Sequence, residues 1–304
     1  MSLDSPRTTT TTAIGPAAQH VAESRAWVPW VVAGGAAIVA LGIAVGLPAS
    51  VLLVVTSVVI ASVNLLGLGV VTGTAGMIAL CQLSFAAVGA WVLEFLLLRT
   101  SLPEIAGGFA FVVALLGGAT VAAVFGVLLG LPALRLRGVN LAVITLGVAA
   151  ALDMTLQKVF FPNQWENLRI ARPFGIAFGG EGDRQYFLFA AIAAILVALG
   201  VHLLQRGRWG ASWRAVAFSE RGAASAGTSV RVAKLTAFGV SAFVGGLAGG
   251  LLVGQITQSN AITFQPVNSL GMYVLSIIVG AHLIEMALVG GILFVLIPEL
   301  LTRW

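Results

Sequence analysis

The stretch ASVLLVVTSVVIASVNLLGLGV (residues 49–70) contains no charged side chain. It is long enough to cross a bilayer as a helix, which takes about 20 predominantly apolar residues. Similar runs recur along the 304-residue chain, which is 59% hydrophobic and 9% charged, with a mean hydropathy of +1.04. Soluble domains carry about 25% charged residues. The composition therefore excludes an ordinary soluble domain.

The apolar runs are continuous, and this decides between the two structures that can span a bilayer. Lipid offers no hydrogen-bond partners, so a spanning backbone must form helices or a closed barrel. Barrel strands alternate polar and apolar side chains, and these runs do not. We therefore predict an all-α polytopic membrane protein with about 8–10 transmembrane helices. The expected spans are 28–47, 49–70, 77–98, 105–131, 139–161, 185–205, 232–257, 268–281 and 285–302.

Some of these segments are expected to be broken or re-entrant. The run 268–281 is short for a full span, which favours a re-entrant half-helix over the alternative of two full spans in 268–302. In the stretch 70–82, Gly73 and Gly76 favour a helix break at membrane depth, which is tolerated where the backbone faces protein or a wet cavity. The run GGLAGG (245–250) predicts a close packing face.

Basic residues gather in two connections between spans, 133–138 and 206–235. The positive-inside rule assigns both connections to the cytoplasm, and the mixed-charge segment 162–184 is then an external loop. This orientation predicts a multi-pass protein of the cytoplasmic membrane with a cytoplasmic N-terminus. Residues 1–26 are predicted to be a disordered cytoplasmic tail, and 27–304 a single transmembrane domain. The net charge is +5, and many of the basic residues lie in connections beside spans. The charge therefore does not indicate nucleic-acid binding.

Sequence motifs of enzymes are absent. There is no GxxxxGK[ST] phosphate loop, no HExxH zinc motif and no GxSxG nucleophile elbow. The single cysteine, Cys81, excludes an intramolecular disulfide or a CxxC metal site. We therefore predict no catalytic residue, no metal site and no nucleotide site on this chain. Energy for any transport must come from an ion gradient or from another subunit.

Ionisable residues within spans are functional candidates by default. Asp153 lies inside a predicted span and is either a polar contact between helices or a pathway residue. His282 and Glu285 are three residues apart at the proposed C-terminal break. They either satisfy an exposed helix end or form a proton or substrate site. Glu94 and Arg99, near the outer end of a span, are expected to pair or to reach the interface.

The basic connection RGRWGASWRAVAFSERGAASAGTSVRVAKL (206–235) has internal structure of its own. Trp209, Trp213 and Val216 are spaced i, i+4, i+7, which predicts an amphipathic segment at the membrane surface. Ser219 is a good N-cap residue, and Gly227 suits the position after a helix C-terminus. A helix of about two turns over 220–226 with small side chains would let another protein approach closely. The alternative is an ordinary basic loop.

This connection also carries a resemblance. ERGAASAG followed by VRVAKLTAFGVSAFVGGLAGGL (220–251) resembles the cytoplasmic coupling region of ABC-importer permeases, above all the branched-chain amino-acid permeases of the LivM type. GLPALRLRGVNLAVITLG (130–147), GTAGMIALCQLSFAAVGAW (73–91) and LIPELL (296–301) are similar to further stretches of that family. The resemblance covers about 60–301.

The resemblance implies an ABC-importer permease fold and a division of labour between subunits. Implied partners are a second permease subunit, two ATPase subunits that carry ATP and magnesium, and an external solute-binding protein that would meet the loop 162–184. The implied substrates are branched-chain or other small amino acids, and this chain itself binds no cofactor. The predicted ATPase-coupling residues are Ser219, Glu220, Arg221, Ala223, Ala224, Gly227 and Lys234. For the translocation pathway we expect the polar residues Gln82, Ser84, Asn140 and Asp153, with Gln258 and Asn260 at an outer mouth.

Two departures from the family pattern leave rival hypotheses open. GAHLIEMAL (280–288) stands where the family usually has a GG-x-G-[ST]-x-x-G-P run, and Ala79 replaces a usual serine. One rival is a gradient-driven secondary carrier that uses Asp153 and Glu285. The other is a membrane scaffold subunit that does not transport.

Overall fold

The computed structural model describes residues 28–133, 139–155, 172–177, 179–256, 261–280 and 284–303. This described part contains helices and no strand, so the all-α prediction is confirmed. The main helices are α2 (Val28–Gly46), α3 (Ala49–Gly69), α4 (Gln82–Arg99), α6 (Ala110–Ala133), α7 (Val139–Thr155), α8 (Glu181–Arg206), α9 (Arg208–Phe218), α10 (Glu220–Ser225), α11 (Val230–Gln255), α12 (Pro266–Val279) and α13 (Ile284–Arg303). Shorter pieces are η1 (Val70–Thr74), α5 (Leu102–Ala106), η2 (Gly107–Phe109), η4 (Pro173–Gly175) and η5 (Ala261–Phe264).

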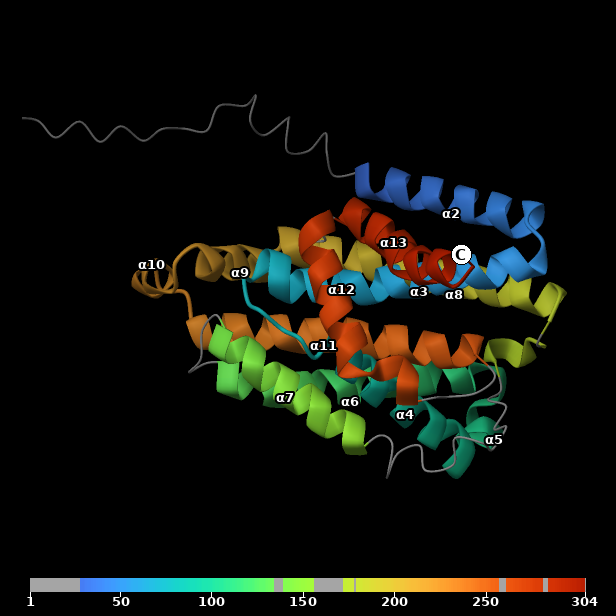
Figure 1. Cartoon of the computed structure of the whole chain (residues 1–304), viewed down its shortest axis with the longest axis horizontal. Coiled ribbons are helices and arrows are strands. Elements are labelled where there is room, and N and C mark those ends of the chain that lie inside the picture. The colour runs from blue at the N-terminus through green and yellow to red at the C-terminus, as the bar shows by residue number, and fades with distance from the viewer. Residues whose placement is uncertain are drawn as a thin grey trace, which may run out of the picture.

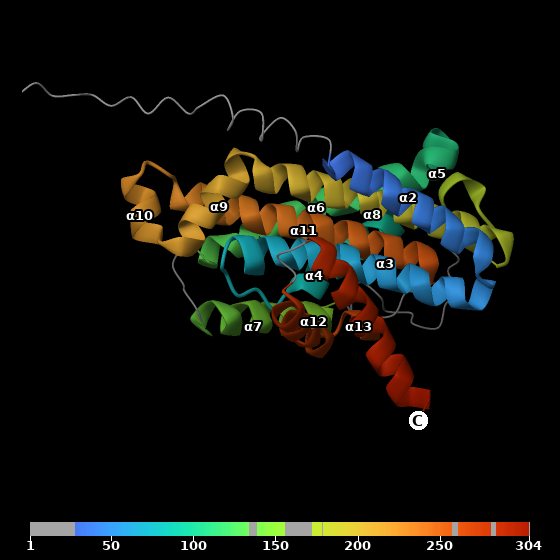
Figure 2. The same ribbon diagram turned by 90° about the horizontal axis from the view of Figure 1, so that it is seen from above.

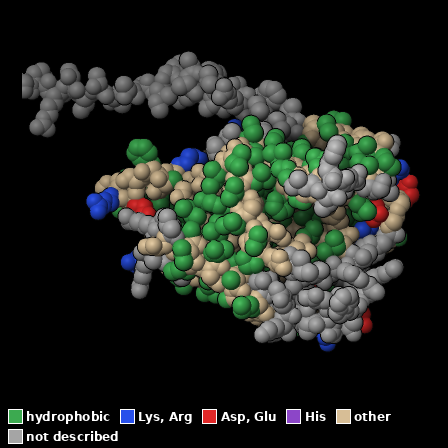
Figure 3. Space-filling model, in the orientation of Figure 1, with side chains coloured by type: hydrophobic (Ala, Val, Ile, Leu, Met, Phe, Trp, Pro, Cys, Tyr) green, Lys and Arg blue, Asp and Glu red, His purple; other side chains and the backbone are tan. Residues whose placement is uncertain are grey.

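The helices run side by side, and their surface fits a bilayer. Within the described residues, five helical segments are long and apolar enough to cross a membrane, and shorter apolar segments accompany them in α2, α7, α12 and α13. Figure 3 shows a broad hydrophobic surface, with the coloured charged side chains gathered toward the two ends of the molecule. We name these the α10 end and the α5 end, after the helices that lie there in Figure 1. The predicted class of polytopic membrane protein is confirmed.

Helix α11 is the centre of the bundle and packs against α3, α4 and α6 (Figure 1). The packing depends on glycine, because the backbones of neighbouring helices touch. A Cβ built on Gly249 would lie 1.8 Å from the carbonyl oxygen of Ala86 in α4. One on Gly246 would lie 2.9 Å from the Cα atom of Ala119 in α6. The predicted packing face of the run 245–250 is therefore confirmed.

Two predicted span boundaries were wrong. Helix α4 begins at Gln82 instead of residue 77. The predicted span 105–131 lies within the apolar helical segment Leu102–Leu131, which comprises α5, η2 and most of α6. Helix α8 begins at Glu181, so the last residues of the predicted external loop form its first turn. The acidic Glu181 and Asp183 suit that turn because negative charge stabilises a helix N-terminus.

The C-terminal helices differ from the others in length and direction. Helix α12 has 14 residues, short of the roughly 20 that a full span takes, and it ends at Gly280 with a left-handed φ of 72°. Figure 2 shows α13 leading away from the body of the bundle toward the C-terminus. The short α12 agrees with the favoured half-helix over 268–281.

Candidate functional site

The chain between α3 and α4 is a true helix break. The α-helix gives way to the π-helical turn η1, and residues 75–81 are not helical. Gly76 has φ +65°, a conformation that L side chains rarely adopt. The break predicted from Gly73 and Gly76 is therefore confirmed, and Gly76 provides the positive φ.

Side chains from distant helices satisfy the backbone of this break. The Leu80 amide donates to the hydroxyl oxygen of Thr145 in α7 over 3.1 Å. The Ser269 hydroxyl of α12 donates to the Leu80 carbonyl over 2.8 Å. Irregular backbone at membrane depth needs such partners because lipid supplies none. The break is therefore a built part of the fold.

Gln82, the first residue of α4, is the centre of a buried polar network. Its Nε2 donates to the side-chain oxygen Oδ1 of Asn64 over 3.0 Å, to the Asn64 carbonyl over 3.3 Å and to the Ser241 carbonyl over 3.4 Å. The Ser241 hydroxyl donates to Gln82 Oε1 over 2.9 Å. The network joins α3, α4 and α11 just after the break.

A cavity of about 550 Å³ lies among α3, α4, α11, η5, α12 and α13. Its walls are largely aliphatic and aromatic, and four polar residues line it. No charged side chain appears among its described lining residues. The volume is in the range of small-molecule sites, which are mostly apolar with a few placed polar groups. The four polar residues are Ser57, Asn64, Thr263 and Asn268.

At the α10 end, α9 and α10 form a helical knob. The Ser219 hydroxyl accepts the amide of Gly222 over 3.1 Å, and Gly227 follows the helix with φ 80°. Both predicted caps are confirmed, and the helix ends at Ser225, one residue earlier than predicted. Arg221 and Ala224 are exposed. Ala223, predicted to face a partner, is 4% exposed and packs inward.

The knob is attached to α11 by a salt bridge and a hydrogen bond. Lys234 Nζ lies 3.0 Å from Glu220 Oε1, and the Lys234 side chain is only 3% exposed. Trp213 Nε1 donates to the hydroxyl oxygen of Thr236 over 3.0 Å. Trp213 and Val216 are buried in the core, so the apolar face of α9 packs on the protein itself. The expectation of a segment lying on the membrane surface was wrong for that face.

The knob and the end of α8 both contact the broken segment. From α9, Ala217 lies so close that a Cβ on Gly76 would be 3.1 Å from its Cβ. From α8, Gln205 Nε2 donates to the hydroxyl oxygen of Thr74 over 3.1 Å. A second cavity, of about 280 Å³, lies between the break and the knob and is lined by Glu220 and Lys234 among others. Movement of α9–α10 would therefore reach both α11 and the break.

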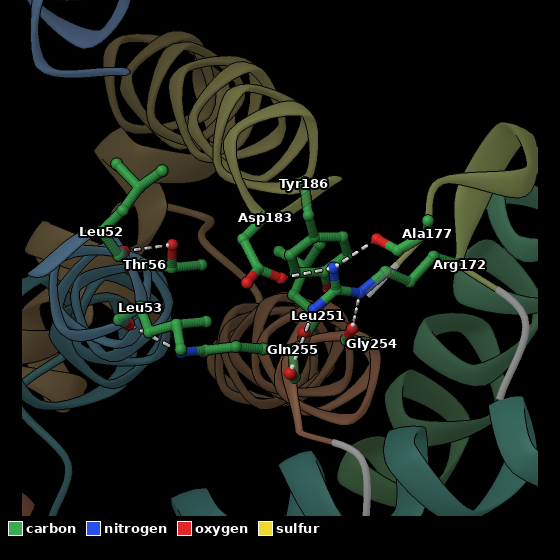
Figure 4. A network of polar contacts seen from close by, with 10 residues as sticks. All are labelled: Leu52, Leu53, Thr56, Arg172, Ala177, Asp183, Tyr186, Leu251, Gly254 and Gln255. Carbon is green, nitrogen blue, oxygen red and sulfur yellow. Dashed lines mark hydrogen bonds and ion pairs between the residues drawn. The ribbon is translucent and has the colours of Figure 1, made fainter. Parts of the chain in front are cut away.

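At the α5 end, Arg172 ties the segment before α8 to the end of α11 (Figure 4). Its guanidinium donates to the carbonyls of Gly254 over 3.0 Å, Ala177 over 3.1 Å and Gln255 over 3.4 Å. It forms an ion pair of 2.7 Å with Asp183. It also lies 4.7 Å from the ring centroid of Tyr186, whose hydroxyl donates to the Leu251 carbonyl. Arg172 thus forms this clamp, and it comes from a segment that the sequence predicted to be a polar loop.

The comparisons with known proteins identify the family. The profile of the family described as "Branched-chain amino acid transport system / permease component" matches residues 47–304. The chain belongs to this permease family. This confirms the resemblance seen in the sequence.

Two curated relatives of the chain are named as branched-chain amino acid permease proteins. They are the "High-affinity branched-chain amino acid transport system permease protein LivM" of Escherichia coli (strain K12) and that of Salmonella typhimurium (strain LT2). Each is 33% identical over 216 residues, which cover 62% of this chain and 49% of the relative. The chain thus spans about half the length of these relatives. No solved structure matches it.

The fold brings together only some of the predicted pathway residues. Gln82 and Ser84 are both buried in α4, but neither is among the described residues that line the larger cavity. Asn140 is exposed at the start of α7, away from the cavity. Asp153 lies in α7 and Glu285 in the first turn of α13, but their side chains are outside the described part. Gln258, Asn260 and His282 are outside the described residues altogether.

The permease has four functional candidates that the sequence did not single out. Asn64 and Ser241 complete the network of Gln82, and Arg172 clamps the end of α11. Phe218, the last residue of the knob's first helix, is 94% exposed. A large apolar side chain beside a well-capped helix in a basic connection was a visible signal for Phe218. The other three depend on contacts between residues far apart in the chain.

Proposed function

We propose that this permease is the membrane-spanning subunit of an ATP-driven importer of branched-chain or related small amino acids. The observation that carries the proposal is the knob α9–α10, which is exposed on its outer side and joined to α11 on its inner side by Lys234. A helix that presents Arg221 and Ala224 to solvent offers a docking surface. The description of the family and the names of the two relatives support the substrate class.

The proposed partners follow from what this chain does and does not carry. Two ATPase subunits would bind ATP and magnesium and receive the knob, which makes the α10 end and the N-terminus cytoplasmic. A second permease subunit would complete the membrane part. A solute-binding protein would meet the α5 end, where the segment held by Arg172 lies. This division leaves catalysis to the ATPase subunits.

The mechanism we propose transmits movement of the knob along α11. ATP-driven closure of the ATPase pair would shift α10, and the Glu220–Lys234 pair would pass that shift to α11. Ser241, seven residues beyond Lys234 on α11, holds Gln82 and thereby the start of α4. Ala248, Gly249 and Leu252 on the same helix line the cavity. Displacement of α11 would thus change the cavity, which is a shift between two packed states.

The cavity favours this proposal over a gradient-driven carrier. Proton and ion pathways in membranes use ionisable side chains. The described lining residues of the cavity are uncharged. A described wall without charged groups thus supports an importer driven through the knob.

Transport measurements with a charge reversal test the proposal. The complex with its ATPase and binding proteins would be reconstituted in vesicles, and leucine uptake and solute-stimulated ATP hydrolysis measured. Glu220→Lys would place a second cation against the buried Lys234, so we expect at least a tenfold loss of both activities with normal membrane insertion. The swapped variant, Glu220→Lys together with Lys234→Glu, is the matched control, because it restores an ion pair between the same two positions and should recover activity.

Two results would count against the function. One is leucine uptake by the wild type that needs no nucleotide and collapses with an uncoupler, which would indicate a secondary carrier. The other is an assembled wild-type complex whose ATP hydrolysis never responds to any loaded binding protein, which would indicate a scaffold. Wild-type uptake by Glu220→Lys would remove the coupling role of the knob.

A further inference from the structure

The orientation of the Asn64 side-chain amide follows from its neighbours. Gln82 Nε2 meets two backbone carbonyl oxygens, those of Asn64 and Ser241, and a carbonyl oxygen only accepts. This nitrogen is therefore correctly placed in the Gln82 amide. The Asn64 atom that faces it at 3.0 Å must be an acceptor, hence Oδ1. The Asn64 NH₂ group must then point away from Gln82.

The NH₂ group of Asn64 has a cavity beside it. Asn64 is 4% exposed and lines the cavity of about 550 Å³. Within the described residues, no acceptor meets its Nδ2. A donor on a cavity wall that makes no hydrogen bond to the described protein is available to a solute. Its further partner can therefore come from what occupies the cavity.

The surroundings select the chemistry of that occupant. The other polar lining groups are partly engaged: Ser57, for example, accepts from Gln255 Nε2 over 2.8 Å and donates to the Leu53 carbonyl over 3.2 Å. Leu83, in the first turn of α4, also lines the cavity, and its amide already donates to the Ser269 hydroxyl oxygen over 3.4 Å. The remaining wall is apolar. An occupant with a negative acceptor at one end and a hydrocarbon side chain at the other fits this arrangement.

We propose that Asn64 is a specificity-determining residue that donates through Nδ2 to the carboxylate of an amino acid passing through the cavity. Gln82 and Ser241 are positioning residues, because they fix which end of the Asn64 amide faces the solute. Recognition then needs no charged group in the cavity, which avoids burying an uncompensated charge when the site is empty. This inference rests on the proposed transport function.

Two substitutions test the donor by different routes. Asn64→Asp keeps the shape and the acceptor for Gln82 but turns an acceptor toward the cavity, where it would repel a carboxylate. Gln82→Met keeps the length of the side chain and releases the orientation of Asn64. We expect leucine uptake at saturating binding protein to fall more than about tenfold in the first variant, because a hydrogen bond to a charged group is lost, and less in the second. Ser62→Ala is the matched control: Ser62 is a buried polar residue of α3 whose hydroxyl bonds to Val58, and it does not line the cavity.

Direct binding gives the second readout. Saturation-transfer NMR with L-leucine on the purified complex, without binding protein, should give a signal for wild type and Ser62→Ala that disappears in Asn64→Asp. Assembly is checked by copurification with the ATPase subunits.

Wild-type uptake and an unchanged NMR signal in Asn64→Asp would overturn the inference while leaving the transport function intact. Failure of both variants to assemble would assign the network a purely structural role and would also overturn it. A wild-type complex that neither binds nor transports leucine would instead remove the proposed function, and this inference with it.

Discussion

At the scale of single residues, the buried ion pairs distinguish this chain from a simple stack of apolar helices. The Arg172 and Asp183 side chains are 1% and 10% exposed, whereas those of the neighbouring Arg184 and Glu181 are 38% and 83% exposed. A buried charge is tolerated only with an opposite charge and further hydrogen bonds, and Arg172 has both. Both pairs have their acid at the start of α8, so they form a natural comparison.

Arg172→Met should destabilise the protein by about 3–5 kcal/mol. It leaves Asp183 buried without its partner, and it removes the donor to the carbonyls of Gly254 and Gln255 at the end of α11. Arg184→Met should cost less than about 1 kcal/mol, as expected for an exposed pair. Unfolding by SDS titration in mixed micelles measures both. Equal stability losses in the two variants would contradict the role of the clamp.

At the scale of elements, local signals predicted what depends on neighbours in the chain. The caps of α10 follow from Ser219 and Gly227, which act within one turn of their own positions. The start of α4 does not follow from such signals. It depends on Thr145 and Ser269, which lie 65 and 189 positions beyond Leu80. No local sequence pattern predicts that these two hydroxyls form hydrogen bonds with the backbone of Leu80.

The contact between α11 and α4 gives a prediction for the elements. Gly249→Ala would place a Cβ 1.8 Å from the Ala86 carbonyl oxygen, so the two helices would have to separate. We expect a loss of about 1–3 kcal/mol or more, the cost of overpacking. Gly147→Ala on α7 is the control, since a Cβ there meets nothing within 4 Å and alanine favours helix. Thermal unfolding in detergent compares them, and equal melting temperatures would exclude a tight α11–α4 contact.

At the scale of the whole molecule, α11 links the two ends of the bundle. It begins beside the knob, where Lys234 pairs with Glu220, and ends in the clamp of Arg172. Between these points it holds the network of Gln82 and one wall of the cavity. A signal at either end of the molecule therefore reaches the cavity through one rigid helix.

Docking of an ATPase subunit at the α10 end predicts a role for Phe218. Interface anchors are large side chains that become fully desolvated on binding, and Phe218 is 94% exposed in the isolated chain. Phe218→Ala should weaken the affinity for the ATPase subunit by about 2 kcal/mol, or roughly 30-fold. Val232→Ala, 58% exposed at the same end on α11, should change it little. Titration of labelled ATPase into the detergent-solubilised permease measures the dissociation constant, and equal values for the two variants would place the docking surface elsewhere.

By itself, the sequence determined the class of the protein, most of its spans, the break near Gly76 and the capped helix α10. Hydropathy, caps and glycine conformations act through residues that are close in the chain, so a single sequence contains them. Only the tertiary structure decided which polar residue faces the cavity. The sequence indicated Gln82. The side-chain amide of Gln82, however, is hydrogen-bonded to Asn64 and Ser241, and Asn64 lines the cavity instead. That outcome depends on the meeting of three helices, and a hydrogen bond already made inside the protein is not available to a solute.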